Sequence, residues 1–182
     1  MPPKGKAAAA EEEVRPRGSW EGTTVTEADL DKLRRSRRIP SVAVVACRAA
    51  EGEEVPAPRD GEVVVFASHF FCGFGLPVSP FLRRFLDHFG LQLHQLGANA
   101  MLVLSAYAVF CEAYLGIWPC IDLWAKLFFL KPQGTSEAMQ ACGAASIYVW
   151  PSGGIPKIPK VDSAKKWHQT FFYEKNVQPA EG

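Results

Sequence analysis

The feature that most constrains the fold is a long apolar segment, residues 97–115, in the middle of the chain. Apolar side chains occupy nearly every face of a helix drawn through this segment, a pattern that belongs to the centre of a fold. We therefore predict a central helix that the rest of the chain covers and that ends at Gly116. Its longest uncharged run, residues 98–111, is too short to cross a bilayer and is interrupted by Asn99, so we expect no transmembrane span.

Two amphipathic helices are predicted before the central one. The first begins at Thr26, which can form a capping box with Asp29, and it runs to about Arg38 because a proline follows two residues later. The second covers residues 80–89, after Ser79 as the N-cap and with a proline in its first turn. Its apolar residues recur at helical spacing, which indicates one buried face.

A fourth helix and three strands complete the predicted elements. The helix is expected from Pro119 to about Lys131, because an acidic residue near its start and a lysine at its end suit the helix dipole. β-Branched and aromatic residues favour strands over 62–66, 144–150 and 170–175. We expect the last two strands to pair as an antiparallel hairpin with a long connection.

Together these elements predict an α+β fold that is predominantly helical. About four helices, including a turn or two over residues 67–74, surround the central apolar helix, and a small antiparallel β pair lies at the C-terminal end. The chain is 48% hydrophobic and 12% aromatic, which is too rich for a disordered protein. Residues 1–22 lack an apolar period and are expected to be a disordered leader. The domain is placed at 23–177, with a tail at 178–182.

The sequence carries no recognisable catalytic constellation. A transposase or integrase centre needs three carboxylates around two metal ions, and only Asp87 and Asp122 suggest one. Asp87 falls on a solvated helix face, and Asp122 suits the start of a helix. The five cysteines contain no Cys-x-x-Cys pair, and the four histidines fall in different elements, where packing or surface roles are expected. We therefore expect no enzyme activity, no cofactor and no metal site.

One segment points to a partner: residues 32–38 hold five cations in seven positions at the end of the first predicted helix. Guanidinium groups clustered in this way pair with phosphate oxygens, which would make the segment a nucleic-acid-binding patch or a nuclear-import signal. The alternative is a solvated helix end whose cations complement the helix dipole. The candidate nucleic-acid-binding residues are Lys32, Arg34, Arg35, Arg37 and Arg38.

Exposed aromatic rings, on which single-strand binders stack bases, are not indicated by the sequence pattern. The phenylalanines and the tryptophan at positions 81, 85, 89, 124 and 128 fall on helix faces with core spacing. A second basic segment, the lysine-containing arm 151–166, is weaker because no aromatic residue is interleaved with its cations.

Several segments, which together span residues 61–177, resemble the gypsy-type transposon domain family of plants. The resemblance implies an origin in transposon-encoded proteins and no established activity, cofactor or binding residue. The segments that carry it are Gly61-Glu62-Val63-Val64-Val65-Phe66, His69-Phe70, Gly73-Phe74-Gly75-Leu76-Pro77, Phe81-Leu82-Arg83-Arg84-Phe85-Leu86, Leu96-Gly97-Ala98-Asn99, Cys111-Glu112-Ala113-Tyr114-Leu115-Gly116, Asp122-Leu123-Trp124, Leu127-Phe128, Cys142-Gly143-Ala144-Ala145-Ser146-Ile147, Trp167-His168, Phe171-Phe172-Tyr173 and Lys175-Asn176.

Two functions stay open for such a domain. The first is a non-catalytic structural or protein-interaction module, working through a partner protein or self-association, and a large exposed apolar patch would support it. The alternative is a nucleic-acid-binding module that uses the local basic patch, since a net charge of +1 excludes a globally basic surface. Without a secretory leader or a transmembrane segment, we expect reduced thiols, no membrane partner, and a nuclear or cytoplasmic location.

Overall fold

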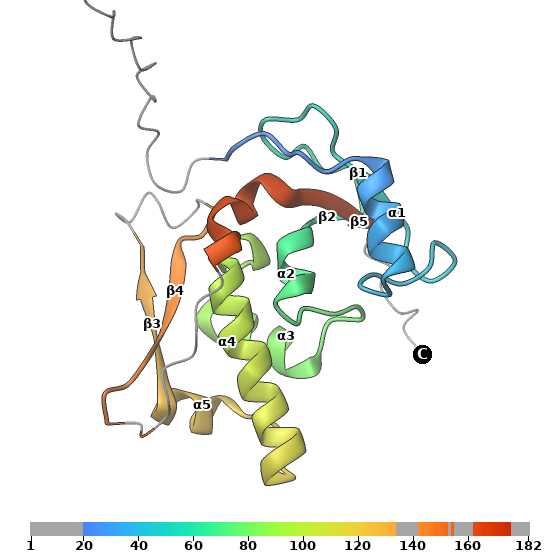
Figure 1. Cartoon of the computed structure of the whole chain (residues 1–182). Coiled ribbons are helices and arrows are strands. Elements are labelled where there is room, and N and C mark those ends of the chain that lie inside the picture. Colours follow the sequence, from blue (N-terminus) through green and yellow to red (C-terminus); the bar gives the residue numbers. More distant parts are fainter. Residues whose placement is uncertain (1–19, 134–141, 153, 155–161, 176–182) are drawn as a thin grey trace, which may run out of the picture.

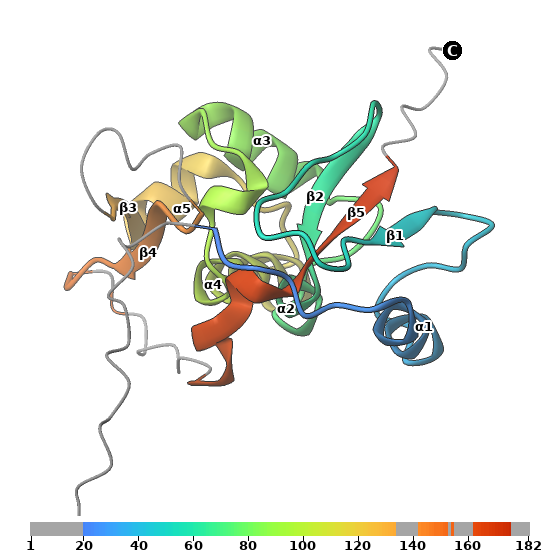
Figure 2. The same cartoon turned by 90° about the horizontal axis from the view of Figure 1, so that it is seen from above.

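Two small antiparallel sheets flank a central group of helices in the computed structural model, which describes residues 20–133, 142–152, 154 and 162–175 (Figure 1). The α+β class predicted from the sequence is confirmed. Viewed from above, α1 and the three-stranded sheet lie at one end and the β3–β4 hairpin lies at the other, with α2, α3 and α4 between them (Figure 2). The helices are α1 (Glu27–Arg35), α2 (Ala67–Phe71), α3 (Pro80–Phe89), α4 (Ala98–Val109) and α5 (Ile121–Leu127).

Two predicted helix starts, at Thr26 and Ser79, and the predicted stop at Gly90 are found where the local signals place them. The Thr26 side chain accepts from the backbone of Asp29, whose carboxylate accepts from the Thr26 backbone in return, so the capping box at the start of α1 is confirmed. Ser79 caps α3 by accepting from the Leu82 N–H at 3.2 Å. Gly90 ends α3 in the left-handed conformation. Helix α1 itself stops at Arg35 and not near residue 38.

The first sheet has the order β1–β5–β2, from strands β1 (Cys47–Ala49), β2 (Glu62–Phe66) and β5 (Phe171–Lys175). Strand β5 is central and antiparallel to both neighbours. Its first three residues, 171–173, are aromatic and fully buried, as expected for a strand covered on both faces. The strands predicted over 62–66 and 170–175 are therefore confirmed.

The predicted hairpin between 144–150 and 170–175 is wrong. Strand β4 (Ala145–Val149) pairs with β3 (Phe128–Pro132) in a separate two-stranded sheet, while β5 lies between β1 and β2. Strand β5 instead pairs on both of its edges, with β1 on one side and β2 on the other. Local strand signals say nothing about which distant strand becomes the partner.

The predicted fourth helix is shorter than expected. Helix α5 spans Ile121–Leu127, and residues 128–131, expected to be its last turn, belong to β3. Phe128 has extended backbone angles and pairs with Val149 across the hairpin. Trp124 and Phe128 are nonetheless both buried, as predicted, with stacked rings 5.8 Å apart. The apolar pattern thus identified the buried residues and misassigned the secondary structure that buries them.

Helix α4 continues without a break into a π-helical segment, η2 (Phe110–Leu115), and Gly116 ends it as predicted. The expectation that no stretch is long enough to cross a bilayer is wrong on length and composition: Ala98–Leu115 is an 18-residue helix with a mean hydropathy of 1.4. The helix continues past Cys111, where the run counted from sequence stopped. A core helix of a soluble protein passes the same test, so length alone does not indicate a membrane span.

Only 33% of Ala98–Leu115 is buried, so the rest of the chain covers it less completely than predicted. Its first three turns contact α2, β4 and the 3₁₀ segment η4 (Asp162–Thr170), where Ala98, Met101 and Leu104 are buried. The last turns extend beyond the other elements (Figure 1). This emerging end is the first notable surface of the molecule.

The residues just before the predicted domain start contact the domain. Trp20 packs against Phe66, Phe171 and His94, with ring centroids 5.5–6.1 Å apart. Glu21 forms an ion pair with His168 at 3.0 Å. The boundary at residue 23 stays a prediction. Of the leader predicted at 1–22, residues 1–19 lie outside the described residues. The tail predicted at 178–182 lies outside them as well.

Candidate functional site

The end of α1 brings most of the predicted basic residues to one place. The Arg38 N–H donates to the Leu33 carbonyl and the Arg37 N–H to the Arg34 carbonyl, both at 2.9 Å, a pair of bonds that forms a Schellman motif. Arg37 holds the left-handed position of this motif with a φ of 56°. Glycine is the usual residue there because a Cβ is strained in that conformation. The chain then turns away from the helix axis toward Ile39, which is buried.

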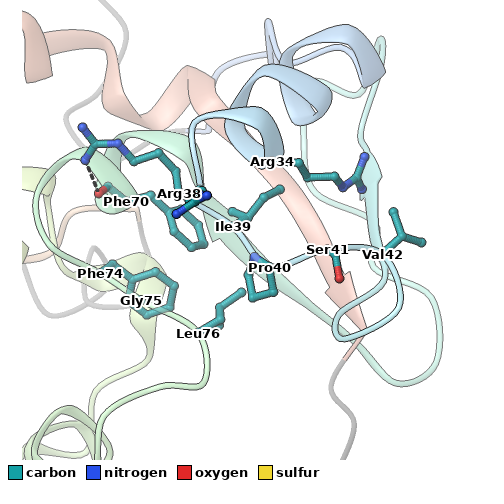
Figure 3. Close-up of a pocket in the computed structure, with 11 residues that line it drawn as sticks. Arg34, Arg38, Ile39, Pro40, Ser41, Val42, Phe70, Phe74, Gly75 and Leu76 are labelled. Carbon is teal, nitrogen blue, oxygen red and sulfur yellow. Dashed lines mark hydrogen bonds between the residues drawn. The ribbon is translucent and has the colours of Figure 1, made fainter.

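An open pocket of about 810 Å³ lies where this turn meets the segment after α2 (Figure 3). Its arginines lie on either side of the Ile39–Pro40 segment, and the facing wall comes from residues 70–76 (Figure 3). No acidic side chain lines it. We call it the arginine pocket, and its principal residues are Arg34, Arg37, Arg38, Ile39, Phe74 and Leu76.

Two of the pocket arginines are partly engaged within the protein. Arg34 forms an ion pair with Asp31 at 3.0 Å and donates to the Cys47 carbonyl at 3.3 Å, which ties α1 to β1. Arg38 donates to the Phe70 carbonyl at 3.3 Å (Figure 3). Its guanidinium carbon also lies 4.8 Å from the centre of the Phe71 ring, a cation–π contact. These contacts hold the two groups in defined positions at the pocket.

The remaining predicted cations differ in their surroundings. Lys32 is exposed, forms an ion pair with Asp29 at 2.8 Å and does not line the pocket. Arg35 also lies outside the pocket, whereas Arg37 lines it. Both are exposed and form no ion pair with any residue that the structure describes. Three of the five predicted residues thus line the arginine pocket. Arg35 does not line it and is the last residue of α1.

Sequence reasoning missed the aromatic and apolar residues beside these cations. Phe71 is 62% exposed, although the sequence pattern did not indicate surface aromatic rings. Phe74 and Leu76 belong to a glycine-containing loop that is distant in sequence from α1, and both line the pocket. The two glycines at positions 73 and 75 were the only local indication of irregular backbone in this loop.

We call the emerging end of α4 and η2, with the residues just after Gly116, the apolar projection. Trp118 and Tyr114 are 85% and 80% exposed, and the Phe110 and Tyr114 rings stack with centroids 6.2 Å apart. Its members are Val109, Phe110, Tyr114, Leu115, Ile117 and Trp118. Glu112 is the only charged residue between positions 109 and 118. A cluster of large apolar side chains of this size is uncommon on a monomer surface.

Buried contacts anchor the base of the apolar projection. Cys111 is fully buried beside exposed neighbours, and its carbonyl accepts from the Ile117 N–H at 3.0 Å. The Tyr107 hydroxyl donates to the Cys120 carbonyl at 2.8 Å, which fixes the chain after the turn at Gly116. The exposed rings are therefore carried on a hydrogen-bonded turn at a fixed helix end.

The residues that would be needed for catalysis are dispersed. Asp87 is exposed on α3, Asp122 is exposed in the first turn of α5, and Glu112 is exposed on η2. Among the described residues, no three His, Cys, Asp or Glu side chains are placed to hold a metal ion. Of the four histidines, His88 is exposed and His69 is fully buried. None of these residues lines the arginine pocket.

Two of the five cysteines are poor nucleophiles at neutral pH. All five are free, at positions 47, 72, 111, 120 and 142. Burial raises the pKa of Cys142 to about 12 and that of Cys47 to about 11, so neither forms appreciable thiolate at neutral pH.

Comparison with known proteins gives one match. Residues 63–132 match the family described as Putative gypsy type transposon. No curated protein and no solved structure matches the chain. The matched range runs from β2 to β3 and contains both α4 and the apolar projection. The C-terminal part of the resemblance read from sequence, residues 142–176, lies outside it.

Proposed function

Residues 63–132 match the Putative gypsy type transposon family, and from this match we propose that the chain is a non-catalytic, transposon-derived protein-interaction module. The observation that supports the proposal is the apolar projection, in which six large apolar side chains are 44–85% exposed. Burying these side chains in an interface would remove apolar surface from water, which is the main favourable contribution to protein association.

The partner we propose is a second copy of the chain. Tyr114 and Trp118 together offer on the order of 350 Å² of surface, and the whole projection on the order of 700 Å². A standard interface buries roughly 800 Å² on each partner. The projection carries a single charge, at Glu112, so two copies meeting about a two-fold axis would bury little charge in the centre of the interface.

Sedimentation velocity over a concentration series tests this proposal. The unmodified chain is expected to dimerise as its concentration rises, and the double variant Tyr114→Ser with Trp118→Ser is expected to stay monomeric with an unchanged circular dichroism spectrum. A matched control replaces two other exposed apolar residues, Val44→Ser with Val55→Ser, and should dimerise normally. An unmodified chain that stays monomeric throughout, or a double variant that still dimerises, would rule out self-association through this surface.

A second function, nucleic-acid binding, is favoured by a different observation. Arg34, Arg37 and Arg38 all line one pocket, and no carboxylate lines it. The test is the fluorescence anisotropy of a labelled oligonucleotide over a salt series, in which binding should weaken steeply as salt rises. Arg37→Glu with Arg38→Glu, which reverses two of the three cations that line the pocket, should abolish binding. Arg83→Glu with Arg84→Glu, an exposed pair on α3, is the matched charge control and should bind normally.

A further inference from the structure

The arginine pocket combines two kinds of surface that a phosphate-binding patch alone does not need. Its floor is apolar, with Ile39 only 3% exposed and Phe74 only 5% exposed, and Leu76 completes it. Its polar side chains are those of three arginines and Ser41. A ligand that fits both surfaces has a flat apolar part and an anionic part close to each other.

A nucleotide unit of a single strand has this chemistry. The pocket volume of about 810 Å³ lies in the range of roughly 300–1,000 Å³ that is typical of small-ligand sites. In a duplex the bases are stacked and paired, so only an unpaired base can enter an apolar pocket. We propose that the arginine pocket binds single-stranded nucleic acid, with one base against Ile39, Phe74 and Leu76 and the flanking phosphates on Arg37 and Arg38. This inference rests on the second proposed function.

A stacking surface lies beside the pocket. The Phe71 ring is 62% exposed, and the Arg38 guanidinium lies 4.8 Å from its centre. Single-strand binders combine a basic groove with exposed aromatic rings, and arginine contributes cation–π contacts to such sites. Phe71 therefore offers a second base position next to the pocket. An acidic peptide would find the cations and the apolar floor, but it would not use a planar platform of this kind.

The backbone at Arg37 also fits a binding role. Arg37 is the one described non-glycine residue with a positive φ, and it lies at the pocket edge, exposed and without an ion pair to any described residue. A strained conformation at a ligand-binding position is a common arrangement in proteins. The turn holds the Arg37 backbone at this edge, and its guanidinium is available to an incoming phosphate.

The pocket can be filled without changing its charge. Gly75 lines it, and a Cβ built at Gly75 meets no atom within 4 Å. Gly75→Leu is therefore expected to occupy space in the pocket while the domain still folds. Ala28→Leu, at an exposed position on the same helix as Arg34, is the matched control for an added leucine. Phe71→Ala removes the exposed ring and serves as an independent variant.

Anisotropy with a labelled uridine homopolymer, a matched RNA duplex and a glutamate-rich peptide tests the inference. The single strand should bind at least tenfold more tightly than the duplex. Gly75→Leu and Phe71→Ala should each weaken the single strand at least fivefold and leave duplex binding unchanged, whereas Ala28→Leu should change neither. The folding of each variant is checked by circular dichroism and thermal unfolding.

The other outcomes distinguish a failure of the base-in-pocket inference from a failure of the proposed nucleic-acid binding. If single strand and duplex bind equally, or if Gly75→Leu has no effect, the base-in-pocket inference is overturned. Arginine-dependent, salt-sensitive binding would in that case still support the nucleic-acid function. If the glutamate-rich peptide binds and is weakened by Gly75→Leu while the oligonucleotide does not bind, the pocket is a peptide site. Loss of all binding in the unmodified chain overturns both.

Discussion

At the scale of single residues, Arg37 has an energetically unfavourable backbone conformation in the folded protein. Its left-handed backbone is unfavourable for an L-residue with a side chain by about 1 kcal/mol relative to glycine. The hydrogen bonds of the Schellman motif hold it there. Stability and binding are therefore expected to respond in opposite directions to a change at this position.

Arg37→Gly tests this opposition. We expect the free energy of unfolding to rise by about 1 kcal/mol, because glycine adopts the left-handed conformation without strain. Urea denaturation measures the change. Arg35→Gly is the matched control: it removes a similar side chain from the helical last turn, where it should destabilise the domain by about 1 kcal/mol. Equal destabilisation by both substitutions would show that Arg37 is not strained.

His69 is the second residue with a predictable consequence. It is fully buried between aromatic rings, 4.9 Å from the Phe66 ring centre and 5.3 Å from that of Trp167. Neither ring nitrogen has a well-formed hydrogen bond to a described residue. Burial lowers the pKa of His69 from 6.5 to about 4, although the Leu96 backbone partly offsets this effect. The histidine is therefore neutral in the folded protein at neutral pH.

The pH dependence of stability follows from this pKa. Between about pH 6.5 and pH 4 the unfolded chain binds a proton at position 69 and the folded chain does not, so stability falls as the pH falls. The loss is on the order of 3 kcal/mol. Chemical denaturation at several pH values should show this loss in the unmodified chain and in the exposed-site control His88→Gln. His69→Leu should lack it.

Comparing the pH-dependent loss of stability between the variants removes the contribution of other titrating groups. Burial raises the pKa of Glu174 to about 7, which acts in the opposite direction, since stability is lost as the pH rises from about 4.5 to about 7. Glu174 titrates in all three proteins and cancels. A His69→Leu variant that loses as much stability on acidification as the unmodified chain would contradict the assignment to His69.

At the scale of elements, a polar network joins the edge strands of the first sheet to the loop between them. Arg48 of β1 donates two hydrogen bonds to Glu62 of β2, at 2.7 and 3.0 Å, across the central strand. Its guanidinium carbon lies 4.3 Å from the centre of the Tyr173 ring. The Tyr173 hydroxyl in turn donates to Glu53. The Arg48 hydrogen bonds lower the pKa of Glu62 to about 2, so this carboxylate is charged at neutral pH.

Arg48→Ala is expected to destabilise the domain by about 2 kcal/mol, because it leaves the half-buried Glu62 and Glu53 carboxylates without their cation. Arg48→Lys should recover only part of the loss, since an ammonium cannot form the two-pronged contact with Glu62. Thermal or urea unfolding measures both. A lysine variant as stable as the unmodified chain would show that charge alone, and not guanidinium geometry, holds the strands.

At the scale of the whole molecule, the family match covers a part that does not complete its own sheets. Strand β2 pairs with β5, and β3 pairs with β4, so each edge of the matched segment depends on a strand outside residues 63–132. The buried aromatic residues of β5 are also missing from the segment. Isolated strands of this length do not hold their conformation in water.

A fragment of residues 63–132 is therefore expected to lack cooperative unfolding and near-ultraviolet circular dichroism, whereas residues 20–175 should show both. Thermal scans of the two fragments provide the measurement. The longer fragment is the control for the effects of truncation. Cooperative unfolding of the short fragment with a native-like spectrum would mean that the two small sheets are dispensable for the helical core.

The sequence by itself determined the features that depend on neighbours within a few residues. The capping box at Thr26, the N-cap at Ser79 and the stop at Gly116 are found as predicted, because each acts through hydrogen bonds or backbone conformation of adjacent residues. The buried face of α3, with Phe81, Leu82 and Phe85, is also as predicted, since helical spacing places its apolar residues on one side. The cluster of cations at 32–38 could also be recognised from the sequence, because its members are neighbours along the chain.

Only the tertiary structure decided which distant segments meet. The partners of β5, the strand conformation of residues 128–131 and the placement of Phe74 and Arg37 around one pocket depend on contacts between residues far apart in sequence. Exposure is decided in the same way: the apolar pattern is continuous along Ala98–Leu115, yet neighbouring elements cover only its first turns. Periodicity states which side chains are apolar, whereas burial depends on whether another part of the chain reaches them.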